Sequence, residues 1–84
     1  MKLTDAKTFG EAVRIYRKKQ KATQIQLAAI ANTGVRFIGD LENGKPTVQL
    51  DKALRVAKIL GMKIGIINEP EHFEPSVRKF QGIE

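Results

Sequence analysis

The sequence contains no cysteine and only one histidine among its 84 residues. Without cysteine the chain forms neither a disulfide nor a thiolate metal site, and a reducing compartment such as the cytoplasm is favoured. The single histidine, His72, has no second histidine or cysteine near it, so the sequence gives no metal site and no catalytic base. We therefore expect no cofactor and no metal.

Long apolar runs and phosphate-binding glycine-rich loops are missing too. No apolar stretch approaches the ~20 residues that cross a bilayer, and the N-terminus lacks the apolar core of a signal peptide. No paired acid and base and no nucleophile constellation is present, which argues against an enzyme. The four Phe and one Tyr fall mostly in expected core or tail positions, which argues against a nonspecific RNA or membrane-surface binder. The sequence thus favours a cytoplasmic protein that is not an enzyme.

Acidic residues are scarce in most of the chain. Overall, 15 Lys and Arg face 9 Asp and Glu, and the formal net charge is +6. Residues 1–63 carry 13 basic and 5 acidic side chains, whereas residues 64–84 carry 2 basic and 4 acidic ones. A basic body favours a polyanionic partner such as nucleic acid. The chain has room for only a modest core, so oligomerisation is a reasonable expectation.

Apolar spacing and capping residues predict a mainly α-helical chain. Thr8 with Glu11, and Thr23 with Gln26, read as capping boxes that start two helices. Gly34 is an acceptable N-cap for a third helix, and Thr47 is the expected N-cap of a fourth. The predicted helices span residues 9–20, 24–31, 35–42 and 48–60, with Asn32 and Gly61 as C-terminal stops.

The predicted core follows from residues that recur at helical spacing. In the third helix only Ile38 and Leu41 form such a pair, so the rest of that helix must face something polar or charged. The other expected core residues are Phe9, Val13, Tyr16, Leu27, Leu50, Leu54, Ala57 and Leu60.

After Gly61 the period changes to an alternation that predicts one β-strand over residues 62–68. Met62, Ile64 and Ile66 share one face of that strand. A single strand leaves its hydrogen-bonding groups unpaired, so we expect it to pair with the same strand of a second copy in a homodimer. Residues 69–84 are then expected to form a flexible acidic tail, which either docks on a protein partner or has no partner.

Two short helices joined by a tight turn inside a basic helical domain form a helix-turn-helix. The segments "TQIQLAAIA", "IGDLENGK" and "LDKALRVAKILGM" resemble the Cro/repressor (Xre-type) helix-turn-helix family over roughly residues 8–62. The resemblance implies a four- to five-helix DNA-binding domain over residues 1–61, followed by the strand and the tail. Gly34 departs from this family, which usually has Ser or Thr at that position.

Within that family, "VRFIGDLENGKPTVQLDKAL" followed by a strand and an acidic tail is similar to HipB-type antitoxins, the partners of HipA-like Ser/Thr kinase toxins. That similarity implies a dimeric repressor that binds a palindromic operator in its own promoter and neutralises a toxin. A stand-alone Xre-family regulator without a toxin is the alternative, and a toxin gene in the neighbouring reading frame would separate the two.

The family resemblance also implies roles for individual residues. Arg36, the only long cationic side chain on the predicted recognition helix, is the candidate for a guanine contact, with a phosphate contact alone as the alternative. Val35 is a candidate for a thymine methyl or for packing on the body, and Gly39 allows close approach to the groove. Thr23, Gln24, Gly34, Asn43 and Lys45 are expected at phosphates.

Arg17 and Glu42 occupy positions at which the family carries a partly buried salt bridge between the first helix and the recognition helix. The resemblance therefore implies a structural role for this pair.

Overall fold

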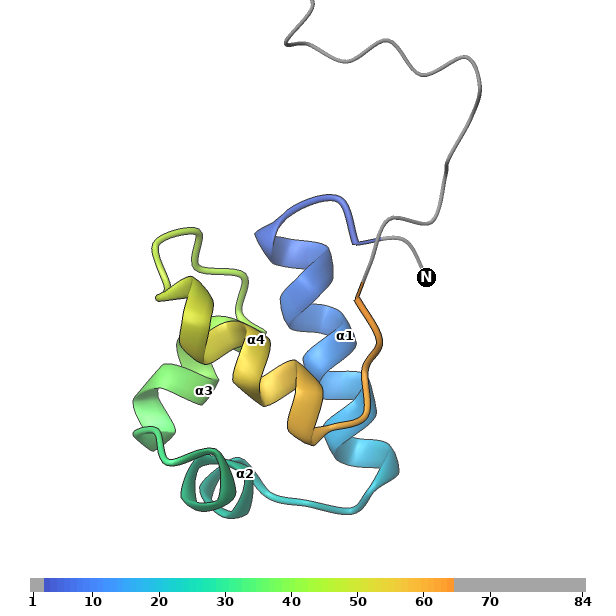
Figure 1. The fold of residues 1–84 in the computed structure, drawn as a ribbon, viewed down its shortest axis with the longest axis vertical. Coiled ribbons are helices and arrows are strands. Elements are labelled where there is room, and N and C mark those ends of the chain that lie inside the picture. Colours follow the sequence, from blue (N-terminus) through green and yellow to red (C-terminus); the bar gives the residue numbers. More distant parts are fainter. Residues whose placement is uncertain (1–2, 65–84) are drawn as a thin grey trace, which may run out of the picture.

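The computed structural model describes residues 3–64, and these form four helices. Their bounds are α1 Ala6–Lys19, α2 Gln24–Ala31, α3 Val35–Glu42 and α4 Leu50–Ile59. Figure 1 shows α4 crossing the middle of the molecule, with α1 on one side, α3 on the other and α2 across one end. The predicted mainly α-helical fold is confirmed, and no helix within the described residues is long and apolar enough to cross a membrane.

Helix α1 begins three residues earlier than predicted because Asp5, not Thr8, is its N-cap. The Asp5 carboxylate accepts from the Thr8 backbone N–H at 2.8 Å, and the Thr8 hydroxyl oxygen accepts from the Asp5 N–H at 3.1 Å. Thr8 is therefore the third helical residue of an upstream capping box. Asp caps at least as well as Thr, so the earlier start is favoured.

Helices α2 and α3 have the predicted bounds. The Thr23 hydroxyl accepts from the Gln26 N–H at 3.0 Å, and the Gln26 side-chain oxygen accepts from the Thr23 N–H at 2.8 Å. Asn32, in the left-handed conformation with φ of 56°, ends α2, and Gly34 is the N-cap of α3. The two helices are thus separated only by residues 32–34.

Helix α4 begins at Leu50 rather than at Val48, and Gln49 rather than Thr47 is its N-cap. Gly61 ends the helix with φ of 83°, as predicted. The Met62 N–H then reaches back to the Ala57 carbonyl at 2.9 Å, which is the long bond of a Schellman motif. This turn buries Met62 in the core of its own domain, where it is 8% exposed.

The core is formed by small and medium-sized apolar side chains from all four helices. Its buried members are Ala12, Val13, Leu27, Ala28, Ala31, Ile38, Leu41, Ala53, Val56, Ala57, Leu60 and Met62, with Phe9, Phe37 and Val48 packed against them. Tyr16, Leu50 and Leu54 were predicted to be core residues, but they are exposed.

The buried face of α4 includes Ala57 and Leu60 as predicted, but it takes in Val56 in place of Leu50 and Leu54. Ala53, Val56 and Ala57 form the buried stripe, and Val56, which the prediction missed, is completely buried. Leu54 is turned about 100° from Ala53 around the helix axis, which takes it to the edge of the stripe. Leu50 belongs to the first turn and extends beyond the body, so it is 70% exposed.

In α1 the inward face contains Gly10 and Arg17, whereas Tyr16 faces outward. A Cβ atom at Gly10 would overlap the Leu41 carbonyl oxygen and lie 2.9 Å from the Glu42 carbonyl oxygen. Glycine at this position therefore allows α1 to pack directly on the last turn of α3. No pattern in the sequence distinguishes Gly10 from the other glycines.

Residues 62–64 form no strand within the single chain. The remainder of the predicted strand, including Ile66, and the predicted tail at residues 69–84 lie outside the described residues.

We predict that Gly10→Ala lowers the free energy of unfolding by about 2–3 kcal/mol, because the backbone of α3 must move away from the added methyl group. Gly39→Ala is the control within the same fold, since a Cβ there meets no atom within 4 Å. The control should raise stability by about 0.5–1 kcal/mol through helix propensity. Urea unfolding followed by circular dichroism measures both, and equal effects of the two substitutions would contradict the close crossing.

Candidate nucleic-acid interface

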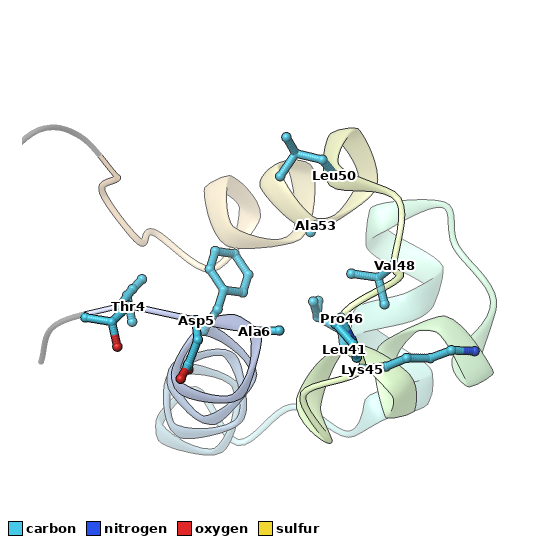
Figure 2. A pocket seen from close by; sticks show the side chains of 11 residues that line it. Thr4, Asp5, Ala6, Leu41, Lys45, Pro46, Val48, Leu50 and Ala53 are labelled. Atoms are coloured by element: carbon cyan, nitrogen blue, oxygen red, sulfur yellow. The ribbon is translucent and has the colours of Figure 1, made fainter. Parts of the chain in front are cut away.

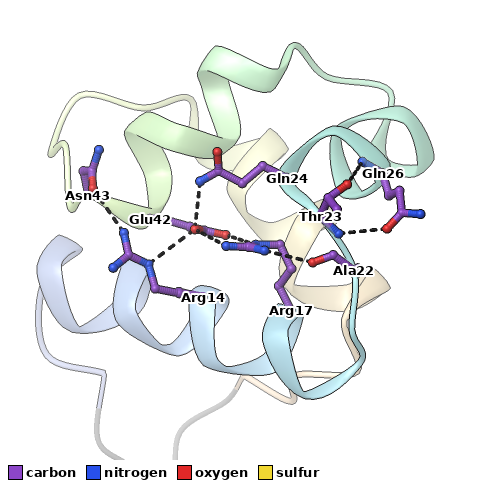
Figure 3. Close-up of polar contacts among 8 residues, drawn as sticks. All are labelled: Arg14, Arg17, Ala22, Thr23, Gln24, Gln26, Glu42 and Asn43. Atoms are coloured by element: carbon purple, nitrogen blue, oxygen red, sulfur yellow. Dashed lines mark hydrogen bonds and ion pairs between the residues drawn. The ribbon is translucent and has the colours of Figure 1, made fainter.

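A buried carboxylate, that of Glu42, connects the first three helices. Its Oε2 accepts from Arg17 Nε at 2.6 Å, and its Oε1 accepts from Arg17 Nη2 and from Gln24 Nε2, both at 3.0 Å. Figure 3 shows Glu42 between Arg17 on α1 and Gln24 at the start of α2. The structure thus contains the Arg17–Glu42 ion pair that the family resemblance implied, and adds Gln24 to it.

A third nitrogen of Arg17 is also hydrogen-bonded. Its Nη1 donates to the Ala22 carbonyl oxygen at 2.8 Å, in the loop between α1 and α2. The side chains of Arg17 and Glu42 are 10% and 0% exposed. No buried side-chain nitrogen or oxygen in the described part of the chain lacks a hydrogen-bond partner. A buried ion pair is stabilising only when its other polar atoms are satisfied in this way.

The environment of Glu42 shifts its protonation equilibrium toward the charged form. Burial on its own would raise the pKa of Glu42, but hydrogen bonds from Arg17 and Gln24 and the charge of Arg17 outweigh it, so the pKa lies below the ordinary glutamate value. The hydrogen bond to Glu42 likewise raises the pKa of Arg17. Both side chains are therefore charged at neutral pH.

Arg14 extends the network to the surface, a role that the sequence reading did not assign. Its Nε lies 3.5 Å from Glu42 Oε1, and its Nη2 donates to Asn43 Oδ1 at 3.4 Å. Asn43, a predicted phosphate contact, is thereby held at the C-terminus of α3. The only available signal was the three-residue spacing of Arg14 and Arg17, which places both on one side of α1.

Side chains of α4 contact both helices of the helix-turn-helix unit, α2 and α3. Arg55 Nη1 donates to the Ala31 carbonyl oxygen at 2.9 Å, which satisfies the C-terminal end of α2. The Lys52 ammonium lies 5.9 Å from the centre of the Phe37 ring on α3. Both contacts join residues that are distant in sequence, and the sequence alone gave no sign of them.

The outward side of α3 carries the predicted base-reading residues. Ile38 and Leu41 are buried, whereas Val35 and Arg36 are exposed. The space beside Gly39 is open, since a Cβ there would meet no atom. Besides the partly exposed carboxylate of Asp40, the helix therefore presents one cation, one small apolar side chain and the backbone at Gly39 on its outer surface.

The predicted phosphate contacts lie at the start of α2, in the turn before α3 and just after the end of α3. Thr23 and Gly34 are exposed N-cap residues of α2 and α3, and Gln24 is held by Glu42. Lys45 is half exposed, and its Nζ lies 3.5 Å from Asp40 Oδ2. An exposed pair of this kind contributes little to stability, so Lys45 can readily be drawn to another anion.

Residues 13–67 match the sequence model of a family described as helix-turn-helix (HTH_3). The chain belongs to the helix-turn-helix family. It is 52% identical over 59 residues to an HTH-type transcriptional regulator, y4mF, of Sinorhizobium fredii, and the match covers 70% of this chain and 78% of that protein. It is 33% identical over 60 residues to an immunity repressor protein of Bacillus phage phi105, covering 71% of this chain but only 42% of the phage protein. This helix-turn-helix protein is thus a DNA-binding transcriptional regulator.

We predict that protonation of Glu42 lowers the free energy of unfolding of the domain at acidic pH. Because its pKa is lowered by folding, its contribution is present above the ordinary glutamate pKa of roughly 4.3 and is lost as the pH falls through the lower pKa of the folded state. Glu42→Gln should lower stability at pH 7 and flatten its pH dependence below about pH 4.5. Glu11→Gln, at an exposed position on α1, is the matched control and should leave the pH profile nearly unchanged. Urea unfolding between pH 3 and 7 checks this, and parallel profiles for wild type and Glu42→Gln would contradict it.

Proposed function

We propose that this regulator is a sequence-specific repressor that binds a palindromic operator as a homodimer. The observation that carries the proposal is the division of α3 into two faces. Ile38, Leu41 and Glu42 hold the helix to the body, and Arg36 with Gly39 faces outward. The relative in phage phi105 is named a repressor, and the basic charge of residues 1–63 favours DNA.

Arg36 is proposed to read sequence. An arginine on a recognition helix can donate two hydrogen bonds to guanine O6 and N7 in the major groove. In the described residues Arg36 is exposed and is joined to no carboxylate. Val35 beside it can contact a thymine methyl, and Gly39 allows the helix to lie close to the base edges.

The phosphate contacts are proposed to position this helix. The amide groups at the starts of α2 and α3 attract phosphates, and Thr23 and Gly34 mark those two starts. Gln24 is oriented by Glu42, while Asn43 and Lys45 follow the C-terminus of α3. The proposal thus places phosphate contacts on both sides of the base-reading surface.

Arg36→Ala should cost roughly 1–3 kcal/mol on operator DNA and relax the preference at one base pair of each half-site. Lys45→Ala is the comparison, because loss of a phosphate contact should weaken binding to all sequences alike and lower the salt slope by about one. Titration against a panel of single-base operator variants measures both effects. An equal loss of affinity for every operator variant with Arg36→Ala would contradict a base-reading role for Arg36.

The dimer is proposed to form through residues 62–68. Ile64 is half exposed at the end of the described residues, whereas Met62 is used by the core of its own domain. The proposed interface therefore depends on Ile64 and Ile66 more than on Met62. A twofold dimer would place its recognition helices about 34 Å apart, one turn of DNA.

Ile66→Pro should abolish the paired strand, since proline removes a backbone donor, and should give monomers that bind a palindrome weakly. Ile66→Val keeps a β-branched side chain and should leave the dimer intact. Sedimentation velocity separates monomer from dimer for both variants. An intact Ile66→Pro dimer, or a wild-type monomer at micromolar concentration, would count against the strand interface.

The antitoxin role is the finer proposal, and the HipB-like segment at residues 35–54 supports it together with the acidic residues after position 68. Co-expression with the product of the adjacent reading frame, followed by mass spectrometry of the purified complex, is the test. A stable complex with a kinase-like protein, and loss of that complex on deletion of residues 70–84, is the expected result. If the regulator instead purifies alone from its natural operon, the antitoxin proposal is wrong and the protein is a stand-alone member of the family.

A further inference from the structure

Helix α2 carries apolar side chains on its outer surface as well as on its inner one. Leu27, Ala28 and Ala31 are buried against the body, but Ile25 and Ile30 are 70% and 68% exposed. A helix at a protein surface normally has a polar outer face. The outer face of α2 therefore has the composition of a contact surface.

A hollow of about 460 Å³ lies beside this outer face, and we call it the α2 groove. It is lined by Gln20, Lys21, Ala22, Gln26, Ala29 and Ile30, from the end of α1, the loop after it and α2. Lys21 stands at its edge, and Lys18 and Lys19 precede it in the last turn of α1. Within residues 3–64 none of these three lysines forms an ion pair.

An apolar hollow with uncompensated lysines suits a segment that joins an apolar side chain to carboxylates. The chain contains such a segment at residues 69–74, "EPEHFE", in which three glutamates surround Phe73. No other part of this basic chain combines an aromatic residue with so many acidic ones. The charge of the groove and that of the segment are therefore complementary.

The end of α4 brings the chain close to the groove. The Gln20 side chain, which lines the groove, donates to the Leu60 carbonyl oxygen at 2.8 Å. The 13 residues from Leu60 to Phe73 can span up to about 43 Å when extended. This is about twice the length of α1, the longest helix, which at 14 residues measures about 21 Å. The chain is long enough to return to the groove.

We propose that residues 69–74 dock in the α2 groove of the same chain, with Phe73 in the hollow and the glutamates facing Lys18, Lys19 and Lys21. Ala22, which lines the groove, immediately precedes Thr23, where a phosphate contact is proposed. Docked glutamates there oppose phosphate binding, so the segment moderates the affinity of the domain for DNA. Only this last consequence depends on the proposed function.

A second hollow is a less suitable site for the acidic segment. It measures about 420 Å³ and lies between the start of α1, α4 and the loop after α3, as Figure 2 shows. Its lining includes Phe9, Val48 and Leu50, but its charged residues are Asp5 and Lys45. Asp5 in that lining repels glutamates, whereas no carboxylate lines the α2 groove. It serves as the competing location in the test.

Backbone amide chemical shifts of the full chain, labelled with nitrogen-15, test the docking directly. Phe73→Ala should shift the amide signals of Lys21, Ala22, Ala29 and Ile30, and high salt should produce the same shifts in the wild type. Phe80→Ala is the matched control, since it removes the other aromatic residue beyond position 68, and should leave the four signals in place. Ile30→Ser, at an exposed position, should make the protein insensitive to Phe73→Ala.

Three results would overturn the proposal. The first is that Phe73→Ala leaves the amide signals of the groove residues unchanged. The second is that its signal changes are confined to Phe9, Val48 and Leu50 at the second hollow. The third is a dependence of the groove shifts on protein concentration, which would mean that the segment docks on another copy. Because the readout needs no DNA, its failure is distinguishable from failure of the repressor proposal.

Discussion

The buried carboxylate of Glu42 is the interaction on which the arrangement of this domain depends. A charge removed from water is costly unless it is paired and fully hydrogen-bonded, and here one arginine and one glutamine from two other helices meet that demand. Removing either charged partner would leave the other buried, at a cost of about 3–5 kcal/mol. The same crossing brings Gly10 against the carbonyls of Leu41 and Glu42, so the packing of α1 on α3 and the polar network constrain each other.

This constraint explains how a helix of eight residues can keep a defined outer surface. Such a helix is not stable alone, and its position must come from tertiary contacts. Its inner side provides them, and the outer side is left to Arg36 and Gly39. Gln24 connects the buried network to the proposed DNA-binding surface. Its side-chain amide donates to Glu42, and it is the first residue of α2, whose N-terminus is proposed to bind a phosphate.

The sequence predicted those parts of the structure that local signals determine. The bounds of α2 and α3 follow from Thr23, Gln26, Asn32 and Gly34, and the structure confirms them. The predicted start of α1 was wrong because Asp5, three residues before Thr8, caps the helix. The predicted start of α4 was wrong because Gln49, and not Thr47, is its N-cap. The ion pair of Arg17 with Glu42 came from family resemblance. The contacts of Gly10, Arg14 and Arg55 join residues that are distant in sequence, and no periodicity in one chain can show such partners.

The outer surface of α3 is proposed to read base edges in the major groove. Selection of binding sites from a randomised duplex library, followed by methylation interference at guanine N7 on the selected site, tests this proposal most directly. If α3 reads bases as a dimer, one palindrome with half-site centres about one DNA turn apart should be enriched, and methylation of a guanine at N7 within each half-site should abolish binding. A library that yields no preferred sequence, or a selected site on which N7 methylation has no effect, would rule out base reading by α3 in the major groove.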